Sequence, residues 1–304
     1  DNGRFPIDVL DDNAVTIWEN DGELWDPENY DRKFKGEMTL REAFKQSRNL
    51  IAIKLAQEIG PGLIKKYARH MGITTRISAV PTIGIGTSAV HLLDLVAAYC
   101  VFPNKGVYVE PVVTAGLKDW EGNKILERAA GRKREVLRPA TAIVMTDMMR
   151  SVIDERGGTG HRIRSGYRFE PAAAGKTGTT NDYADAWFIG FTPHIVAGVW
   201  VGMDDQSLAL WPKQAGSVAA LPLWVRFMKE VYSEVDYYRE RADETFDYPE
   251  ELVVRLAVCN DTHAIATRYC PDQAEDLFIK NEPLPRDCVL HSSARSHNGR
   301  RQRF

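Results

Sequence analysis

Apolar residues recur with two different periods along the chain. The helical spacing of three and four residues appears in 39–59, 63–71, 92–102, 139–152 and 219–232. Residues 172–202 instead hold short runs rich in β-branched and aromatic residues, separated by short polar connections, which predicts an antiparallel meander. A hairpin is predicted over 109–126 around a Gly-Asn pair. Helices beside an antiparallel sheet predict an α+β fold, with the sheet covered by helices.

The composition changes after Tyr232, where an acidic and turn-rich stretch begins. We therefore expect a main domain over 1–232 and a C-terminal appendage over 233–304. A strand is expected over 252–259. The basic, apolar-poor end from Arg295 to Phe304 is expected to be disordered.

The overall composition is that of an ordinary globular domain. The 304 residues are 44% hydrophobic and 27% charged, with a net charge of −3, and they contain no basic stripe with interleaved aromatic residues. These features argue against a nucleic-acid partner. The first residues do not resemble a signal peptide, and no 18-residue apolar window occurs. We expect the chain to start inside a longer protein or to be a processed product.

The first strand of the predicted meander ends in Lys176-Thr177-Gly178. This motif sets an ammonium, a hydroxyl and a bare backbone on one strand, where a small anionic substrate could lie alongside. Lys-Thr-Gly is the third motif of serine enzymes that are acylated by penicillin or by a D-alanyl peptide. The simpler alternative is a strand end bounded by glycine with an exposed lysine.

Ser47-Arg48-Asn49 precedes that motif by 129 residues (176 − 47). By itself a Ser/Asn pair is common where helices begin or break. In acyl-serine enzymes, however, a Ser-x-Asn triplet lies at a helix junction on one wall of the cleft, and Lys-Thr-Gly forms the opposite wall. The order and spacing of the two motifs favour this second interpretation.

Together these motifs resemble the transpeptidase domain of class A bifunctional penicillin-binding proteins. The resemblance includes the surroundings of Ser-x-Asn in 39–49, the stretch 86–99, and Asp-Ala-Trp-Phe-Ile-Gly in 185–190. It covers about 4–232 and implies a fold like that of serine β-lactamases and DD-transpeptidases. The implied activity is a peptidoglycan DD-transpeptidase that cross-links stem peptides in bacterial cell-wall synthesis.

The chain departs from the family pattern at the nucleophile. The family carries its reactive serine in Ser-x-x-Lys, N-terminal to Ser-x-Asn. None of the 11 serines here is followed by lysine three residues later; Ser292, for example, is followed by Arg295. We therefore expect no nucleophile in this chain and no activity from it alone. The glycosyltransferase domain and membrane anchor of class A proteins are also outside it.

The resemblance assigns catalytic roles to three residues. Ser47 would pass a proton toward the departing amine, Asn49 would hold the peptide carbonyl of the substrate, and Lys176 would supply positive field. In the substrate-binding group, Thr177 and Thr179 would bind the terminal carboxylate. The Thr179 N–H would also be one oxyanion donor. Gly178 would let the substrate lie flat on the strand.

The implied partners are stem peptides ending in D-Ala-D-Ala, β-lactams and the segment that carries the nucleophile, the glycosyltransferase domain and the membrane anchor. No cofactor is expected, and no metal at the catalytic site. The implied location is the bacterial inner membrane, facing the periplasm or extracytoplasmic space. Two alternatives stay open: a non-enzymatic peptidoglycan-binding or scaffold module, and a relative of the serine β-lactamases.

The four cysteines are unevenly distributed, with Cys259, Cys270 and Cys288 in the last fifth of the chain. Cys100 lies in an apolar helical run and is interpreted as a buried thiol. A disulfide between Cys270 and Cys288 is the favoured prediction for the tail, and it would indicate an oxidising compartment. The alternative is a zinc site that uses His263 or His291, although no Cys-x-x-Cys pair supports it.

Overall fold

The protein is described here by a computed structural model covering residues 3–18, 24–127, 130–180, 183–205 and 208–292. At its centre lies a three-stranded antiparallel sheet in the order β11-β10-β9, formed by Val196–Gly202, Asp185–Phe191 and Ala174–Thr179. This is the predicted meander, and the predicted α+β class is confirmed. Because β9 is an edge strand, only one of its sides is paired with another strand of the described chain.

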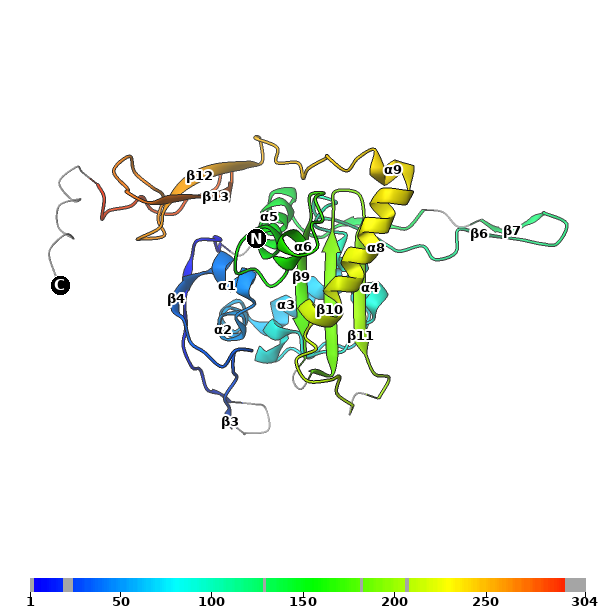
Figure 1. The fold of residues 1–304 in the computed structure, drawn as a ribbon, viewed down its shortest axis with the longest axis horizontal. Helices are drawn as coiled ribbons and strands as arrows, with labels where there is room; N and C mark the ends of the chain where they lie inside the picture. Colours follow the sequence, from blue (N-terminus) through cyan, green and yellow to red (C-terminus); the bar gives the residue numbers. More distant parts are fainter. Residues whose placement is uncertain (1–2, 19–23, 128–129, 181–182, 206–207, 293–304) are drawn as a thin grey trace.

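Helices cover both faces of this sheet (Figure 1). Alternate residues of a strand point to opposite faces. Phe188 on β10 accordingly packs with Trp224 and Met228 of α8 (Leu221–Glu234), whereas Phe191 packs with Met149 of α5 (Pro139–Asp154). The sheet is therefore the middle layer of the domain, and its β9 edge is left beside the N-terminal helices.

The N-terminal part of the chain supplies the elements that face β9. Its strands are β1 (Val9–Asp12), β2 (Ile17–Trp18), β3 (Leu24–Trp25) and β4 (Gly36–Thr39). Its helices are α1 (Leu40–Gln46), α2 (Asn49–Ile59), α3 (Pro61–His70), a 3₁₀ helix (Pro81–Ile85) and α4 (Leu92–Tyr99). Later elements are β5 (Val107–Val109), β6 (Gly116–Lys118), β7 (Lys124–Glu127), β8 (Lys133–Glu135), α6 (Arg162–Ser165), α7 (Gly216–Ala219), α9 (Asp236–Arg239), β12 (Val253–Cys259) and β13 (Gln273–Ile279).

The sequence placed most of these elements correctly, with differences that have local causes. The predicted helix over 219–232 is observed as α8, which begins at Leu221 with Pro222 in its first turn, and the short helix α7 precedes it. The predicted hairpin exists as β6 and β7, but its first strand is shorter than expected, because 107–109 form β5 and pair with β8. Pro111 follows β5 and cannot donate a backbone hydrogen bond, which favours the interruption.

The C-terminal residues form a small unit docked on the main body. Strands β12 and β13 pair with each other, and Val253 and Leu277 pack on Ala140 and Ile143 of α5. The division at 232 remains a prediction, and 293–304, including the expected disordered end, lie outside the described residues. Within the described ranges, no helix is both long and apolar enough to span a membrane.

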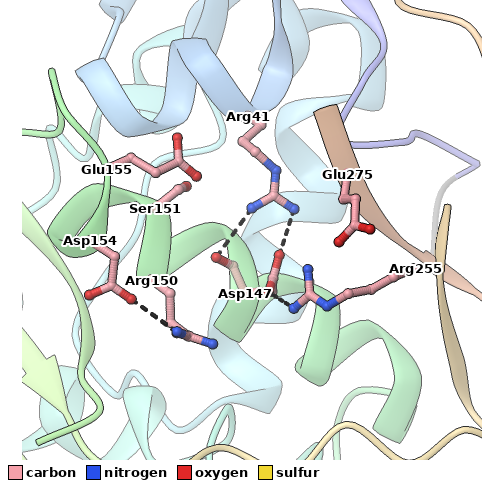
Figure 2. Close-up of a pocket in the computed structure, with 8 residues that line it drawn as sticks. All are labelled: Arg41, Asp147, Arg150, Ser151, Asp154, Glu155, Arg255 and Glu275. Carbon is pink, nitrogen blue, oxygen red and sulfur yellow. Dashed lines mark hydrogen bonds and ion pairs between the residues drawn. The ribbon is translucent and has the colours of Figure 1, made fainter. Parts of the chain in front are cut away.

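A cavity of about 190 Å³ lies where this unit meets α1 and α5 (Figure 2). Its walls carry charges of both signs, from Arg41, Asp147, Arg150, Ser151, Asp154, Glu155, Arg255 and Glu275. Arg41 and Arg255 both reach Asp147, at 2.7 and 2.8 Å. The cavity is therefore lined by a network of ion pairs that joins the elements around it.

Candidate functional site

Ser47 lies at the turn between α1 and α2. Thr39 caps the N-terminus of α1, because its hydroxyl accepts a hydrogen bond from the Glu42 N–H. The helix ends at Ser47, which adopts the left-handed conformation with φ 57° and ψ 51°. This conformation costs a non-glycine residue about 1–3 kcal/mol, and such residues are enriched at functional sites. The turn directs the Ser47 side chain out of the helix.

Arg48 holds this turn in place through ion pairs with Asp12 and Asp31. Its side chain is buried between two carboxylates, with Nε 2.9 Å from Asp12 and Nη1 2.9 Å from Asp31. Asp12 is itself fully buried on β1. Removing one partner of a buried ion pair leaves an uncompensated charge, so these contacts hold the α1–α2 junction in one geometry. Sequence reasoning missed this role, because Arg48 occupies the variable position of Ser-x-Asn.

Lys176 reaches across from β9 to this junction. Its Nζ donates a hydrogen bond to the Ser47 Oγ at 2.7 Å and another to the carbonyl of Thr177 at 3.1 Å. The ammonium also lies 5.8 Å from the centroid of the Phe44 ring on α1. The structure thus brings together the two motifs that are 129 residues apart in sequence. They line one site, with Ser47 on the helix side and Lys176 on the sheet side.

The electrostatic environment of Lys176 is unusual for a lysine. Burial lowers the pKa of its ammonium from 10.5 to about 8. Among the residues the structure describes, no carboxylate forms an ion pair with it. A cation that is partly desolvated and has no anionic partner is suited to bind an incoming carboxylate. Because the pKa remains above 7, most of the population is charged at neutral pH.

The hydroxyl of each of the two threonines of β9 has a hydrogen-bond partner from another segment of the chain. The Thr177 Oγ1 lies 2.8 Å from the Thr159 Oγ1, and the Thr179 Oγ1 accepts a hydrogen bond from the Gly216 N–H at 3.0 Å. An accepting hydroxyl keeps its own proton available for another partner, so Thr179 can still donate. Between them, a Cβ on Gly178 would come within 3.2 Å of the Trp187 Cβ, so the neighbouring strand leaves little room for a side chain there.

Asn49 begins α2, directly after the Ser47 turn. Its side-chain amide donates to the Glu28 carbonyl at 3.0 Å, which places the loop around residue 28 beside the junction. From this loop Tyr30 extends toward Tyr183, which follows β9, and their hydroxyls lie 3.2 Å apart with the rings edge to face. The Tyr30–Tyr183 pair therefore links the helix side and the sheet side of the site.

Two of these contacts were not foreseen from the sequence. Residues 157–160 are rich in glycine and have no pattern that predicts a contact, yet Thr159 donates its N–H to the Lys45 carbonyl and its hydroxyl contacts that of Thr177. Tyr30 lies outside every range in which the sequence predicts a helix or strand. The glycine-rich surroundings of Thr159 were the only available signal, and glycine alone does not indicate which strand a loop will contact. A nucleophile in Ser-x-x-Lys is absent from the sequence itself.

The cysteine prediction requires a correction. Cys270 and Cys288 are not bonded to each other: all four cysteines are free thiols. Cys259, Cys270 and Cys288 instead gather around His291 in a buried cluster, while His263 is not a member of it. Cys100 is free and half-buried, and burial raises the pKa of its thiol.

Comparison with known proteins gives close matches over most of the chain. Penicillin-binding protein 1A of Aquifex aeolicus (strain VF5) is 36% identical over 253 residues, which are 83% of this chain and 33% of that protein. The chain therefore spans about a third of the length of that relative.

Solved structures share the fold. Penicillin-binding protein 1A from Haemophilus influenzae gives a TM-score of 0.81 at 23% identity, covering 95% of this chain and 47% of that one. The PonA1 protein from Mycobacterium tuberculosis in complex with penicillin V gives a TM-score of 0.63 at 23% identity, covering 80% and 66%.

These likenesses agree with the position of the motifs. Residues 6–220 match the family described as the penicillin binding protein transpeptidase domain, and this range contains both Ser47 and Lys176. The range is well over half of the chain. The chain therefore belongs to the penicillin-binding protein transpeptidase domain family, as its resemblance to the class A proteins predicted.

Proposed function

We propose that this chain forms the substrate-binding part of a peptidoglycan DD-transpeptidase that works through an acyl-serine. The observation that carries the proposal is the 2.7 Å hydrogen bond from the Lys176 Nζ to the Ser47 Oγ. Since Ser47 accepts from the ammonium, its own proton points elsewhere and can be passed to a departing amine. The reactive serine would come from a Ser-x-x-Lys segment N-terminal to this chain.

The substrate class follows from the shape and charge of the site. The unpaired side of β9 can align an extended peptide by main-chain hydrogen bonds. The Lys176 ammonium and the Thr177 and Thr179 hydroxyls would then bind the C-terminal carboxylate of a D-Ala-D-Ala stem peptide, or the carboxylate of a β-lactam. Asn49 would hold the peptide carbonyl after releasing Glu28, and the Thr179 N–H would donate to the oxyanion. Gly178 would let the peptide approach the strand.

A stem-peptide substrate implies a location outside the cytoplasm. We propose that the active protein lies at the bacterial inner membrane, facing the periplasm or extracytoplasmic space, because stem peptides are cross-linked there. The partners would be the nucleophile segment, the glycosyltransferase domain and the membrane anchor of the longer protein. The name penicillin-binding protein, shared by the relatives above, supports β-lactams as ligands.

A fluorescent penicillin tests the proposal. We expect no covalent adduct with the 304-residue chain, by intact mass or by gel fluorescence, because no serine in it is followed by a lysine three residues later. A longer polypeptide that includes the Ser-x-x-Lys segment should be acylated, and Lys176→Ala in it should slow acylation by about 10²–10³-fold. Lys213→Ala, at an exposed lysine, is the control.

Three results would contradict the proposal. A stable adduct on the isolated chain would show that the nucleophile lies elsewhere. A longer polypeptide that binds stem peptides without being acylated would favour a scaffold module. Rapid turnover of the penicillin adduct, rather than its accumulation, would favour a β-lactamase.

A further inference from the structure

Three buried cysteines and one buried histidine converge in the C-terminal unit, away from the site described above. Cys259 ends β12, Cys270 lies just before β13, and Cys288 and His291 follow β13. Their exposed fractions are 0%, 7%, 2% and 6%. One ligand atom from each lies within 4.8 Å of the other three. Four potential metal ligands from three separate chain segments therefore share one small volume.

The spacing of these atoms fits tetrahedral coordination. His291 Nδ1 lies 3.5 Å from the Cys259 Sγ and 3.4 Å from the Cys288 Sγ. With zinc–sulfur bonds of about 2.3 Å and a zinc–nitrogen bond of about 2.0–2.1 Å, tetrahedral geometry places nitrogen and sulfur about 3.6 Å apart. The observed separations are close to this value. The three cysteines of the cluster are free thiols, so none of these sulfurs is already used in a disulfide.

Groups around the cluster favour the protonation states that metal binding needs, a thiolate and an imidazole with a free Nδ1. The Thr267 N–H points at the Cys270 Sγ from 3.2 Å, as expected for a sulfur that carries negative charge. The other ring nitrogen of His291, Nε2, lies 3.5 Å from an Asp261 carboxylate oxygen. A carboxylate on the far side of the imidazole would keep the proton on Nε2, so that Nδ1 is free to bind a metal.

The backbone around the cluster is also fixed. The Cys259 N–H donates to the Ala264 carbonyl at 2.9 Å, and the Cys288 N–H donates to the Ile265 carbonyl at 2.8 Å. The 259–267 turn is thereby joined to both the end of β12 and the segment that carries Cys288. Among the described residues, the apolar side chains that pack on the three cysteines are the small ones of Ala264 and Ala266. The sulfurs are therefore not there to fill a large apolar core.

We propose that Cys259, Cys270, Cys288 and His291 form a structural Zn²⁺ site that ties the C-terminal unit together. Three thiolates and one imidazole are a ligand set that selects zinc, and four protein ligands leave no open position for catalysis. A two-stranded sheet has marginal stability of its own in water. A metal that binds the ends of both strands and the segment after them would supply the missing stability.

Metal analysis of the folded, monomeric fraction of the 304-residue chain tests this site. After purification without chelators, we expect one zinc per chain by inductively coupled plasma mass spectrometry. Replacement by Co²⁺ should give the thiolate charge-transfer and strong d–d bands of a tetrahedral sulfur-rich site. Cys288→Ser and His291→Ala should each abolish stoichiometric zinc. Asp261→Asn should weaken zinc binding by about 10–100-fold, as expected for loss of a hydrogen-bonded carboxylate partner.

The chain supplies matched controls. His263→Ala removes the neighbouring histidine that is not in the cluster, and Cys100→Ser removes the cysteine that lies far from it in sequence, so both should retain zinc. Zinc-free folded wild-type protein would overturn the proposal. So would zinc retained by Cys288→Ser, or a non-reduced mass two hydrogens lower that maps to a Cys270–Cys288 bond.

Discussion

The position of Lys176 in the fold determines its charge state and its hydrogen-bond partners. The side chain is partly buried on an edge strand, donates to Ser47 at 2.7 Å, and has no carboxylate partner among the described residues. Burial lowers its pKa to about 8, so that its charge is retained at neutral pH and lost in mild base. The sequence predicted this residue as a site member because Lys-Thr-Gly is a chemical motif. It could not predict the pKa, which depends on what folds around the ammonium.

The titration of Lys176 predicts an alkaline limit to acylation. In a longer polypeptide that contains the nucleophile, the second-order rate of acylation by penicillin should fall as the pH rises through about 8. The reason is that the ammonium, which attracts the ligand carboxylate, loses its proton there. Stopped-flow or fluorescent-gel measurements of the acylation rate, at intervals of about one pH unit between about pH 6 and 10, would test this decline. Lys176→Ala should lower the plateau and remove this decline, and an unchanged decline in that variant would assign the titration to another group.

At the scale of elements, the site depends on how closely backbone segments approach β9. The N-terminus of α7 lies against the end of this strand: the Gly216 N–H donates to the Thr179 hydroxyl at 3.0 Å. Earlier on the same strand, Thr177 forms a hydrogen bond with the hydroxyl of Thr159. Each contact joins β9 to a residue that is distant in sequence and lies in a turn or at a helix start without a strong pattern. Periodicity predicted the strands and helices themselves, whereas contacts of this kind follow from how the elements pack.

Strand β13 was missed for a related reason. Its sequence Gln-Ala-Glu-Asp-Leu-Phe-Ile neither alternates cleanly nor forms a long apolar run. The strand exists because it pairs in full register with β12, from Val253 opposite Ile279 to Cys259 opposite Gln273. Its polar Asp276 is buried by an ion pair with Arg41, a partner 235 residues away that no local pattern can indicate.

Gly216→Ala tests the contact between α7 and the sheet. A Cβ at this position would lie 2.3 Å from the Trp187 carbonyl oxygen and 2.4 Å from that of Gly178, so that backbone must move. We expect the free energy of unfolding to fall by about 1–3 kcal/mol, as for other overpacked sites. Urea unfolding followed by circular dichroism would measure it. Gly62→Ala on α3 is the control, because the added Cβ would have no atom within 4 Å. It should raise the free energy of unfolding by about 0.5–1 kcal/mol, since alanine favours the helix more than glycine does.

At the scale of the whole molecule, buried charges join the C-terminal unit to the domain that holds the site. Arg41 on α1 binds Asp276 on β13 at 2.5 Å and Asp147 on α5 at 2.7 Å. Arg255 on β12 also binds Asp147, at 2.8 Å. Because α1 leads directly to Ser47, the same helix supports the site and receives the C-terminal unit. The sequence separated these regions by composition, and the structure connects them through side chains.

Arg41→Ala should therefore destabilise the whole protein. Two largely buried carboxylates would lose a common partner, and breaking a buried ion pair in this way costs about 3–5 kcal/mol. Arg226→Ala, which removes an arginine that is 82% exposed in a pair on α8, should cost no more than about 1 kcal/mol. Equal losses of unfolding free energy in the two variants, measured in urea at pH 7, would contradict a structural role for the network.

The pH dependence of the same variant separates the charge interaction from simple loss of packing. Burial by itself would raise the pKa of Asp147, but the charges of Arg41 and Arg255 outweigh it and lower the pKa below 3.8. A carboxylate with a lowered pKa stabilises the folded state above the unfolded pKa, and this contribution is lost as the pH falls through the folded value. The difference between the wild type and Arg41→Ala should hence be constant near neutral pH and shrink below about pH 4. A difference that stays constant into acid would mean that Arg41 acts through its packing contacts rather than its charge.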